Sequence, residues 1–206
     1  MPEIKNKELE LTLEVMINKS ISKVNIEDLS KIKDITLNAI DMQGNLNSND
    51  LEDLKIFPKL EICTIRNYKI DDLNYESLAK LNNIDTLQKL RIYDCKFEKK
   101  DLSINIDTIE FISCNNLSIG EIIGNSNIKQ LNILHCQNFN LKKLNKLKKI
   151  YFEDDVITKD IINELLNSSI NEIIFNNCDF KLFANNLLKR LVSIKNVQIL
   201  DKNKIV

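Results

Sequence analysis

Apolar residues recur along the chain in one pattern, in which a first apolar residue is followed by others three, five and, in most copies, ten residues later. The two clearest copies start at Leu87 and Ile170 and read LQKLRIYDCKF and INEIIFNNCDF. Six less complete copies start at Ile32, Leu60, Ile106, Ile128, Leu147 and Ile194. Counting the start as position one, positions four and six point to one side of a strand and positions three, five and seven to the other. The pattern therefore predicts eight strands of the same phase.

The copies indicate a repeated unit, because their starts lie 19 to 28 residues apart along the whole chain. One short aliphatic pattern occurs in any buried strand, whereas eight in order do not arise by chance. The two clearest copies fit the pattern of the leucine-rich repeat at every specified position, and the chain resembles the leucine-rich repeat proteins. This resemblance implies an α/β fold, a leucine-rich repeat solenoid. In this fold a curved right-handed stack carries a parallel β-sheet on its concave face and helices and turns on its convex face.

Four of the five cysteines, Cys95, Cys114, Cys136 and Cys178, occupy position nine of their copies, and Cys63 occupies position four. A small residue that can bond the backbone of a turn is favoured at position nine, and cysteine is compact, usually buried and a weak S–H donor. Disulfides or a metal site would be the alternative. Equivalent positions in successive units favour reduced, buried thiols, and we expect no metal and no cofactor.

The segment before the first copy, residues 1–31, is expected to form a helical N-terminal cap that shields the end of the stack. Apolar residues with helical spacing are Leu9, Leu13, Met16, Ile17 and Ile21. A second short helix is expected to start at Asn25, which is a good capping residue, and to carry Ile26, Leu29 and Ile32. The run into SKIKDITL resembles the entry to the repeats of internalin-type bacterial proteins. Residues 32–206 then hold about eight repeats, and residues 1–206 are expected to form a single domain.

The segments between the strands predict helices on the outer side at 49–57, 72–81, 119–124, 158–167 and 181–192. Thr158 is the expected N-cap of the fourth, with Ile161, Ile162, Leu165 and Leu166 facing the core. The chain has only 3 glycines and 2 prolines, so the asparagine pairs at 82–83, 115–116 and 176–177 are expected to make turns. No capping helix follows the last strand, which predicts an open edge at the carboxyl end.

Charge gives no general case for nucleic acid or an anionic membrane, since the formal net charge is −1 and the pI is about 6.0. The densest basic run comprises Lys142, Lys143, Lys146, Lys148 and Lys149. We interpret this run as a solvated turn and strand start, with a patch for an acidic protein partner as the alternative. The chain opens with no charged-then-apolar leader and contains no apolar run long enough for a membrane span, so we expect a cytoplasmic protein.

The sequence offers no recognisable catalytic constellation. His135 is the only histidine and stands beside Cys136, but a catalytic Cys–His pair needs an exposed thiol, and this thiol is expected to be buried. No C-x-x-C, H-E-x-x-H, Walker or dinucleotide-binding glycine motif occurs. The acid pairs 71–72 and 154–155 are interpreted as solvated turn residues without a metal. We therefore expect a protein that is not an enzyme, with no catalytic residues.

Positions five and seven point away from the core and should line the concave face. They bring together an apolar stripe of Tyr93, Ile112, Leu134, Tyr151 and Ile174. The polar residues that accompany it are Arg66, Arg91, Glu110, Asn132 and Glu153. Tyrosine and arginine around an apolar centre are typical of binding hot spots. A shift of one residue in strand register would bury these side chains instead.

The leading hypothesis is a non-enzymatic protein–protein interaction scaffold that binds a protein partner through those ten residues. Two alternatives stay open. The chain could be a structural or assembly subunit that self-associates through the open carboxyl edge, or an accessory or inhibitory subunit of an enzyme. We expect a monomer, with self-association through that edge as the alternative.

Overall fold

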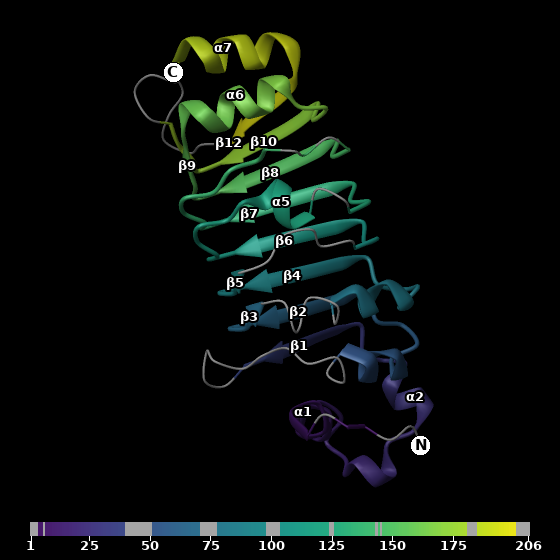
Figure 1. Ribbon diagram of the computed structural model, residues 1–206. Coiled ribbons are helices and arrows are strands. Elements are labelled where there is room, and N and C mark those ends of the chain that lie inside the picture. The colour runs from purple at the N-terminus through teal and green to yellow at the C-terminus, as the bar shows by residue number, and fades with distance from the viewer. Residues whose placement is uncertain are drawn as a thin grey trace.

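The computed structural model describes residues 4–5, 7–39, 51–70, 78–97, 104–123, 126–142, 144, 146–180 and 185–200 (Figure 1). These residues form an α/β structure around an eight-stranded sheet in which every pairing is parallel. Its strands, in sheet order, are β1 (Asp34–Asn38), β2 (Ile62–Arg66), β4 (Lys89–Tyr93), β6 (Thr108–Ile112), β7 (Gln130–Leu134), β8 (Lys149–Glu153), β10 (Glu172–Asn176) and β12 (Asn196–Leu200). This order is also their order in the chain, so each long strand lies beside the next.

The register of the sheet has no stagger. Asp34 of β1 is opposite Ile62 of β2, which is opposite Lys89 of β4, and the same correspondence continues to β12. Each of the eight strands occupies positions three to seven of one sequence copy. The predicted strands and their phase are therefore confirmed.

The chain leaves each long strand through a residue with left-handed backbone geometry. Position eight has a positive φ in six copies, with values from 50° to 62°, at Asn67, Asp94, Ser113, His135, Asp154 and Asn177. Asparagine, aspartate and histidine adopt this geometry more readily than other residues with a Cβ. Asn116 also has a positive φ, as expected for a turn residue. The expectation for Asn82 and Asn83 was wrong, because both lie in the 3-10 helix η3 (Lys80–Asn83).

Short parallel strands follow this bend, and the sequence analysis did not predict them. β3 (Lys69–Ile70) pairs with β5 (Lys96–Phe97), and β9 (Val156–Ile157) pairs with β11 (Asp179–Phe180). Between these pairs, single bridges join Asn115 to Gln137 and Ser118 to Asn140. The chain is therefore held to its neighbour both before and after the bend.

The core lies on the side of the sheet to which positions four and six point. In β1 to β10 these residues are at most 4% exposed, and Phe152 and Phe175 stack with their ring centroids 5.2 Å apart. Helix α5 (Ile119–Ile123), helix α6 (Lys159–Asn167) and helix α7 (Asn185–Ile194) contribute buried residues to the same cluster, together with η2 (Asp53–Ile56) and η3. Helices therefore cover one face of the sheet (Figure 1).

Two of the expected outer helices are largely confirmed. α5 and α6 fall within the predicted ranges 119–124 and 158–167, and Thr158 caps α6 by accepting a hydrogen bond from the Ile161 N–H. Ile161, Ile162 and Leu165 are buried, and Leu166 packs partly buried against the core. The predictions 49–57, 72–81 and 181–192 fall partly outside the described residues. The elements found there are η2, η3 and α7, and η3 and α7 each extend two residues beyond the prediction.

The N-terminal segment is helical, with α1 (Lys7–Ile17), the 3-10 helix η1 (Ile21–Lys23) and α2 (Ile26–Leu29). Asn25 caps α2 and forms a capping box with Asp28, as its sequence position suggested. Leu9 and Leu13 are buried, but Met16 is 51% exposed. Met16 therefore does not share the buried side of α1 with Leu9 and Leu13, which belong to the same buried cluster as the strand residues.

Candidate functional site

Positions three, five and seven of the eight strands form the face of the sheet opposite the helices, which we call the open face. The pairing places Arg66, Tyr93, Ile112, Leu134 and Glu153 side by side at position seven of successive strands. It likewise aligns the position-five residues Arg91, Glu110, Asn132, Tyr151 and Ile174. All ten residues singled out in the sequence are thus neighbours on one face.

The apolar stripe on the open face is half-buried. Tyr93, Ile112, Leu134, Tyr151 and Ile174 each keep part of their surface in contact with solvent. The first three follow one another at position seven, and the other two continue from Leu134 at position five. The stripe therefore offers a continuous apolar surface that crosses five strands.

An exposed arginine stands at one end of this stripe. The guanidinium carbon of Arg66 lies 4.3 Å from the centre of the Tyr93 ring, a cation–π contact. Among the described residues no carboxylate forms an ion pair with Arg66. Its hydrogen-bond donors are therefore available to a ligand, while Tyr93 fixes the position of its planar group.

A polar network occupies the neighbouring part of the open face, around Glu110. The Glu110 carboxylate accepts hydrogen bonds from Lys89 Nζ at 2.9 Å, Arg91 Nε at 2.9 Å and Asn132 Nδ2 at 2.7 Å. Burial alone would raise the pKa of Glu110, but the hydrogen bonds from Lys89, Asn132 and Arg91 outweigh it and hold this pKa below its ordinary value. Arg91 Nη1 also lies 3.1 Å from Asp34 Oδ2 and so reaches across β2 to β1.

Two of the proposed contact residues are less accessible than expected. Glu110 is 7% exposed and Asn132 is 8% exposed, although both point to the open face. The long side chains of Lys89 and Arg91 bond to Glu110, and Gln130 Nε2 bonds to Asn132 Oδ1, so neighbouring groups cover them. Glu110 and Asn132 therefore have little accessible surface and anchor their neighbours, and their contact with a partner stays a prediction.

A second set of hydrogen bonds fixes Tyr151 in the stripe. The Tyr151 hydroxyl donates to Glu153 Oε2 at 2.6 Å and accepts from Asn176 Nδ2 at 2.9 Å. Burial and the hydrogen bond to Glu153 raise the pKa of Tyr151 to about 12, so the phenol stays neutral. This ring therefore takes part in the stripe in one defined orientation.

The five cysteines are free and buried, as the sequence predicted. Cys95, Cys114 and Cys136 each donate through the thiol to the position-six carbonyl of the preceding strand, with S···O distances of 3.3 to 3.6 Å. Burial raises the pKa of every cysteine to about 12. The thiols of Cys95, Cys114 and Cys136 therefore join adjacent units, and the raised pKa disfavours the thiolate form of all five cysteines.

Asp155 occupies position nine of the copy that starts at Leu147, and it is 1% exposed. Its carboxylate accepts from the backbone N–H of Cys136 at 2.7 Å and of Glu153 at 3.2 Å. Burial raises the pKa of Asp155 to about 7 despite these two hydrogen bonds. Interpreting Asp155 as a solvated turn acid was therefore wrong, and its position in the repeat was the signal that could have identified it.

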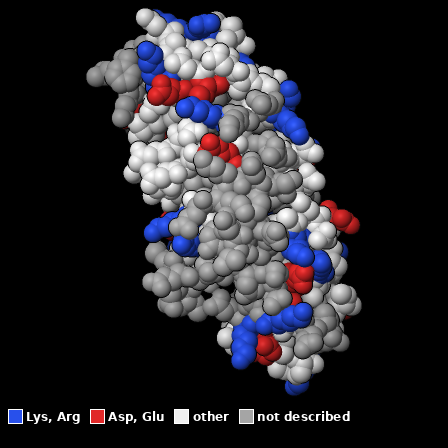
Figure 2. Space-filling model, in the orientation of Figure 1, with Lys and Arg blue, Asp and Glu red and all other residues white. Residues whose placement is uncertain are grey.

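His135 does not form a catalytic pair with Cys136. Its side chain is 51% exposed and its Nδ1 lies 3.4 Å from Asp154 Oδ2, whereas the Cys136 thiol points into the core. The described residues contain no group of three or more histidine, cysteine or acidic side chains that could hold a metal ion. Among the described residues on the side visible in Figure 2, basic and acidic side chains lie in small groups.

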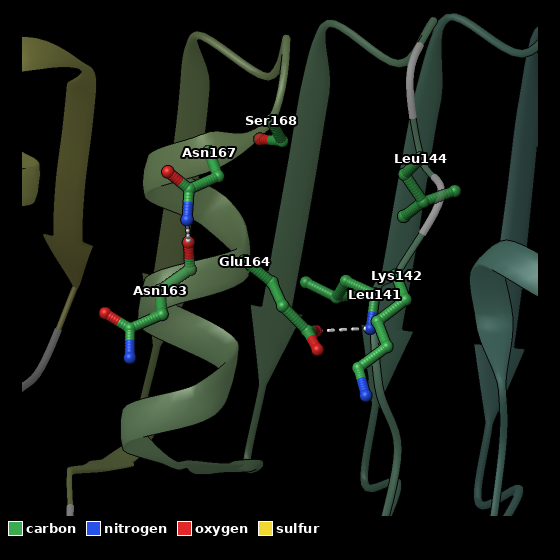
Figure 3. A pocket seen from close by; sticks show the side chains of 7 residues that line it. All are labelled: Leu141, Lys142, Leu144, Asn163, Glu164, Asn167 and Ser168. Carbon is green, nitrogen blue, oxygen red and sulfur yellow. Dashed lines mark hydrogen bonds between the residues drawn. The ribbon is translucent and has the colours of Figure 1, made fainter.

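A hollow of about 250 Å³ lies on the helical side, between α6 and the turn after β7 (Figure 3). It is lined by Leu141, Lys142, Leu144, Asn163, Glu164, Asn167 and Ser168. Glu164, its only carboxylate, accepts a hydrogen bond from the Leu141 N–H at 2.7 Å. That contact gives Glu164 a structural role in fixing the turn.

No protein-family model and no curated protein matches the chain. The described part of the chain contains no helix of sufficient length and apolar character to cross a membrane.

Proposed function

We propose that the chain is a leucine-rich repeat solenoid whose open face is its concave surface, and that it is a non-enzymatic scaffold binding a protein partner there. The observation that carries this proposal is the half-buried stripe of Tyr93, Ile112, Leu134, Tyr151 and Ile174. Apolar and tyrosine side chains that are partly accessible and contiguous release ordered water when a complementary surface covers them.

The polar networks support this proposal because they hold the binding surface rigid before a partner arrives. Glu110 fixes Lys89 and Arg91, and Glu153 and Asn176 fix Tyr151. A surface already ordered in the free protein loses less side-chain entropy on association.

Arg66 suggests the chemistry of the partner's contact. Its guanidinium carbon lies 4.3 Å from the centre of the Tyr93 ring, and Arg66 is exposed and has no carboxylate partner among the described residues. A planar guanidinium in this position favours bidentate pairing with a carboxylate. We therefore expect the partner to present an acidic group beside an apolar segment.

A protein partner is favoured over nucleic acid, because the net charge is −1 and the charges that flank the stripe are of both signs. Five reduced thiols favour a reducing compartment such as the cytoplasm.

The test is affinity capture from the source cells with a Tyr93→Glu/Leu134→Glu double variant. We expect the amount of each specific partner captured by this variant to be at least about tenfold lower than with the native protein, because two charges enter the apolar stripe. The matched control is Thr36→Glu/Thr64→Glu, which adds the same charges at position five of β1 and β2 on the same face, outside the stripe. Retention of every specific partner by the stripe variant, with both variants folded by circular dichroism, would refute the proposal.

A further inference from the structure

In the described part of the chain, β12 is the last strand of the sheet, and its core-side residues are more exposed than those of the other seven strands. Position six is at most 4% exposed in the seven strands from β1 to β10, but at β12 the equivalent residue, Ile199, is 43% exposed. Val197, at position four on the same core side, is half-buried, and Leu200, at position seven on the open face, is 51% exposed. Among the described residues, the core side of the sheet is therefore least covered at this end.

The backbone at this edge is also ready to pair. The Asn196 N–H donates to Asn171 and the Leu200 carbonyl accepts from the Asn177 N–H, so the even-numbered residues of β12 face β10. Because backbone direction alternates along a strand, Val197 and Ile199 present their N–H and C=O groups to the outside. In the described part of the chain, no strand pairs with this edge.

Edge strands are normally protected by charged residues, proline or bulges. β12 reads Asn-Val-Gln-Ile-Leu and has none of these. The apolar surface continues onto α7, where Val192 is 48% and Ile194 is 56% exposed. At the opposite end the core is covered, since Leu9 and Leu13 of α1 are buried. Among the described residues, the core side of the sheet is therefore better covered at the β1 end than at the β12 end.

We propose that β12 of a second copy of this chain pairs with this strand in antiparallel fashion, about a two-fold axis at Gln198. Gln198 then faces Gln198 of the second copy, and Val197 faces Ile199 on the core side. Val197 and Ile199, whose backbone groups point outward, form the hydrogen-bonded pairs, and Gln198 forms the closer non-hydrogen-bonded pair.

The sequence and register of β12 favour a second copy of β12 over an unrelated strand as the partner of this edge. The two-fold register gives each copy the same hydrogen bonds and joins the two open cores through Val197 and Ile199 of both chains. Because β12 has no charged residue, no like charges oppose each other within the pair. A two-fold contact of this kind also closes on itself, so assembly stops at a dimer. The dimer uses the sheet edge and leaves the open face free, so it does not depend on the proposed function.

Cysteine cross-linking tests the register. Directly opposed residues in a non-hydrogen-bonded antiparallel pair have Cβ atoms about 4.5–5.5 Å apart, close to disulfide geometry. We expect Gln198→Cys to form a disulfide-linked dimer on mild oxidation. The control Thr36→Cys, at position five of the opposite edge strand β1, is expected to remain monomeric on a non-reducing gel. The native thiols are buried and do not contribute.

Sedimentation equilibrium tests the interface independently. We expect the native chain to form a dimer. For Ile199→Lys we expect a dissociation constant of the dimer at least about 100-fold higher, because each of the two copies places one lysine charge in the interface. The variant should fold, since Ile199 is already 43% exposed. Thr36→Lys and the stripe variant Tyr93→Glu/Leu134→Glu should leave the dimer unchanged. A monomeric native chain at about 100 µM, or a dimer insensitive to Ile199→Lys, would overturn the proposal.

Discussion

Replacing Gly120 by alanine has two opposite effects on the stability of α5: alanine has the higher helix propensity, but its side chain has no room at this position. A Cβ atom at Gly120 would lie 1.4 Å from the Lys142 carbonyl oxygen and 2.6 Å from its carbonyl carbon. Both are backbone atoms, so no side-chain rotation can relieve the contact. The φ of Gly120 is not positive, and alanine would not be strained by backbone geometry. The outcome therefore depends on the space between α5 and the turn after β7.

The two effects have opposite signs and known sizes. Alanine in place of glycine favours a helix by up to about 1 kcal/mol. Forcing a methyl group into a filled site costs about 1–3 kcal/mol, and a separation of 1.4 Å places Gly120→Ala at the upper end. The net loss of unfolding free energy is about 2 kcal/mol, which lowers the melting temperature by about 4–8 °C for a chain of this length.

Thermal unfolding followed by circular dichroism measures this difference. The control is Asn163→Ala in α6, a half-buried helical position where alanine raises helix propensity without a clash. Its melting temperature should lie within about 1 °C of the native value or above it. A melting temperature for Gly120→Ala equal to or above the native value would refute the close approach of α5 to Lys142.

Two further predictions concern position nine. Because burial raises the pKa of Asp155 from 3.8 to about 7, the folded protein keeps a proton that the unfolded chain releases, so stability falls as pH rises through that interval. The native melting temperature should therefore drop between pH 5 and pH 8, and Asp155→Asn should reduce the drop; equal drops in the two proteins would contradict this. With every cysteine pKa raised to about 12, a thiol reagent at pH 7.5 should modify the five cysteines only after denaturation. Rapid labelling of all five cysteines in the folded chain would disprove their burial.

The strands and their register could be predicted because position in the repeated pattern determines which way a side chain points. Cys95, Cys114 and Cys136 fixed the count, and the pairing of Tyr93 with Ile112 and of Ile112 with Leu134 followed from it. That information is local to each copy. The capping of α2 by Asn25 was predictable for the same reason, since the cap and its partner Asp28 are three residues apart.

Burial on the open face could not be predicted, because it depends on side chains from other strands. Glu110 is covered by Lys89 and Arg91, whose lengths and rotamers the pattern does not specify. The exposure of Ile199 agrees with the open edge expected at the carboxyl end: its position in the copy is a core position, but no further strand in the described part of the chain lies beside it. The short strands, such as β3 and β9, are only two residues long and leave no periodic signal.

The exact correspondence of strand positions separates two kinds of sequence change. The copies start 19 to 28 residues apart, yet every long strand pairs residue for residue with the next. Differences in length are therefore absorbed by the connections between the strands. An insertion or deletion there can alter the helical side without moving a residue on the open face, and a substitution on the open face can change its surface without disturbing the connections. The two surfaces of this protein are free to diverge independently during evolution.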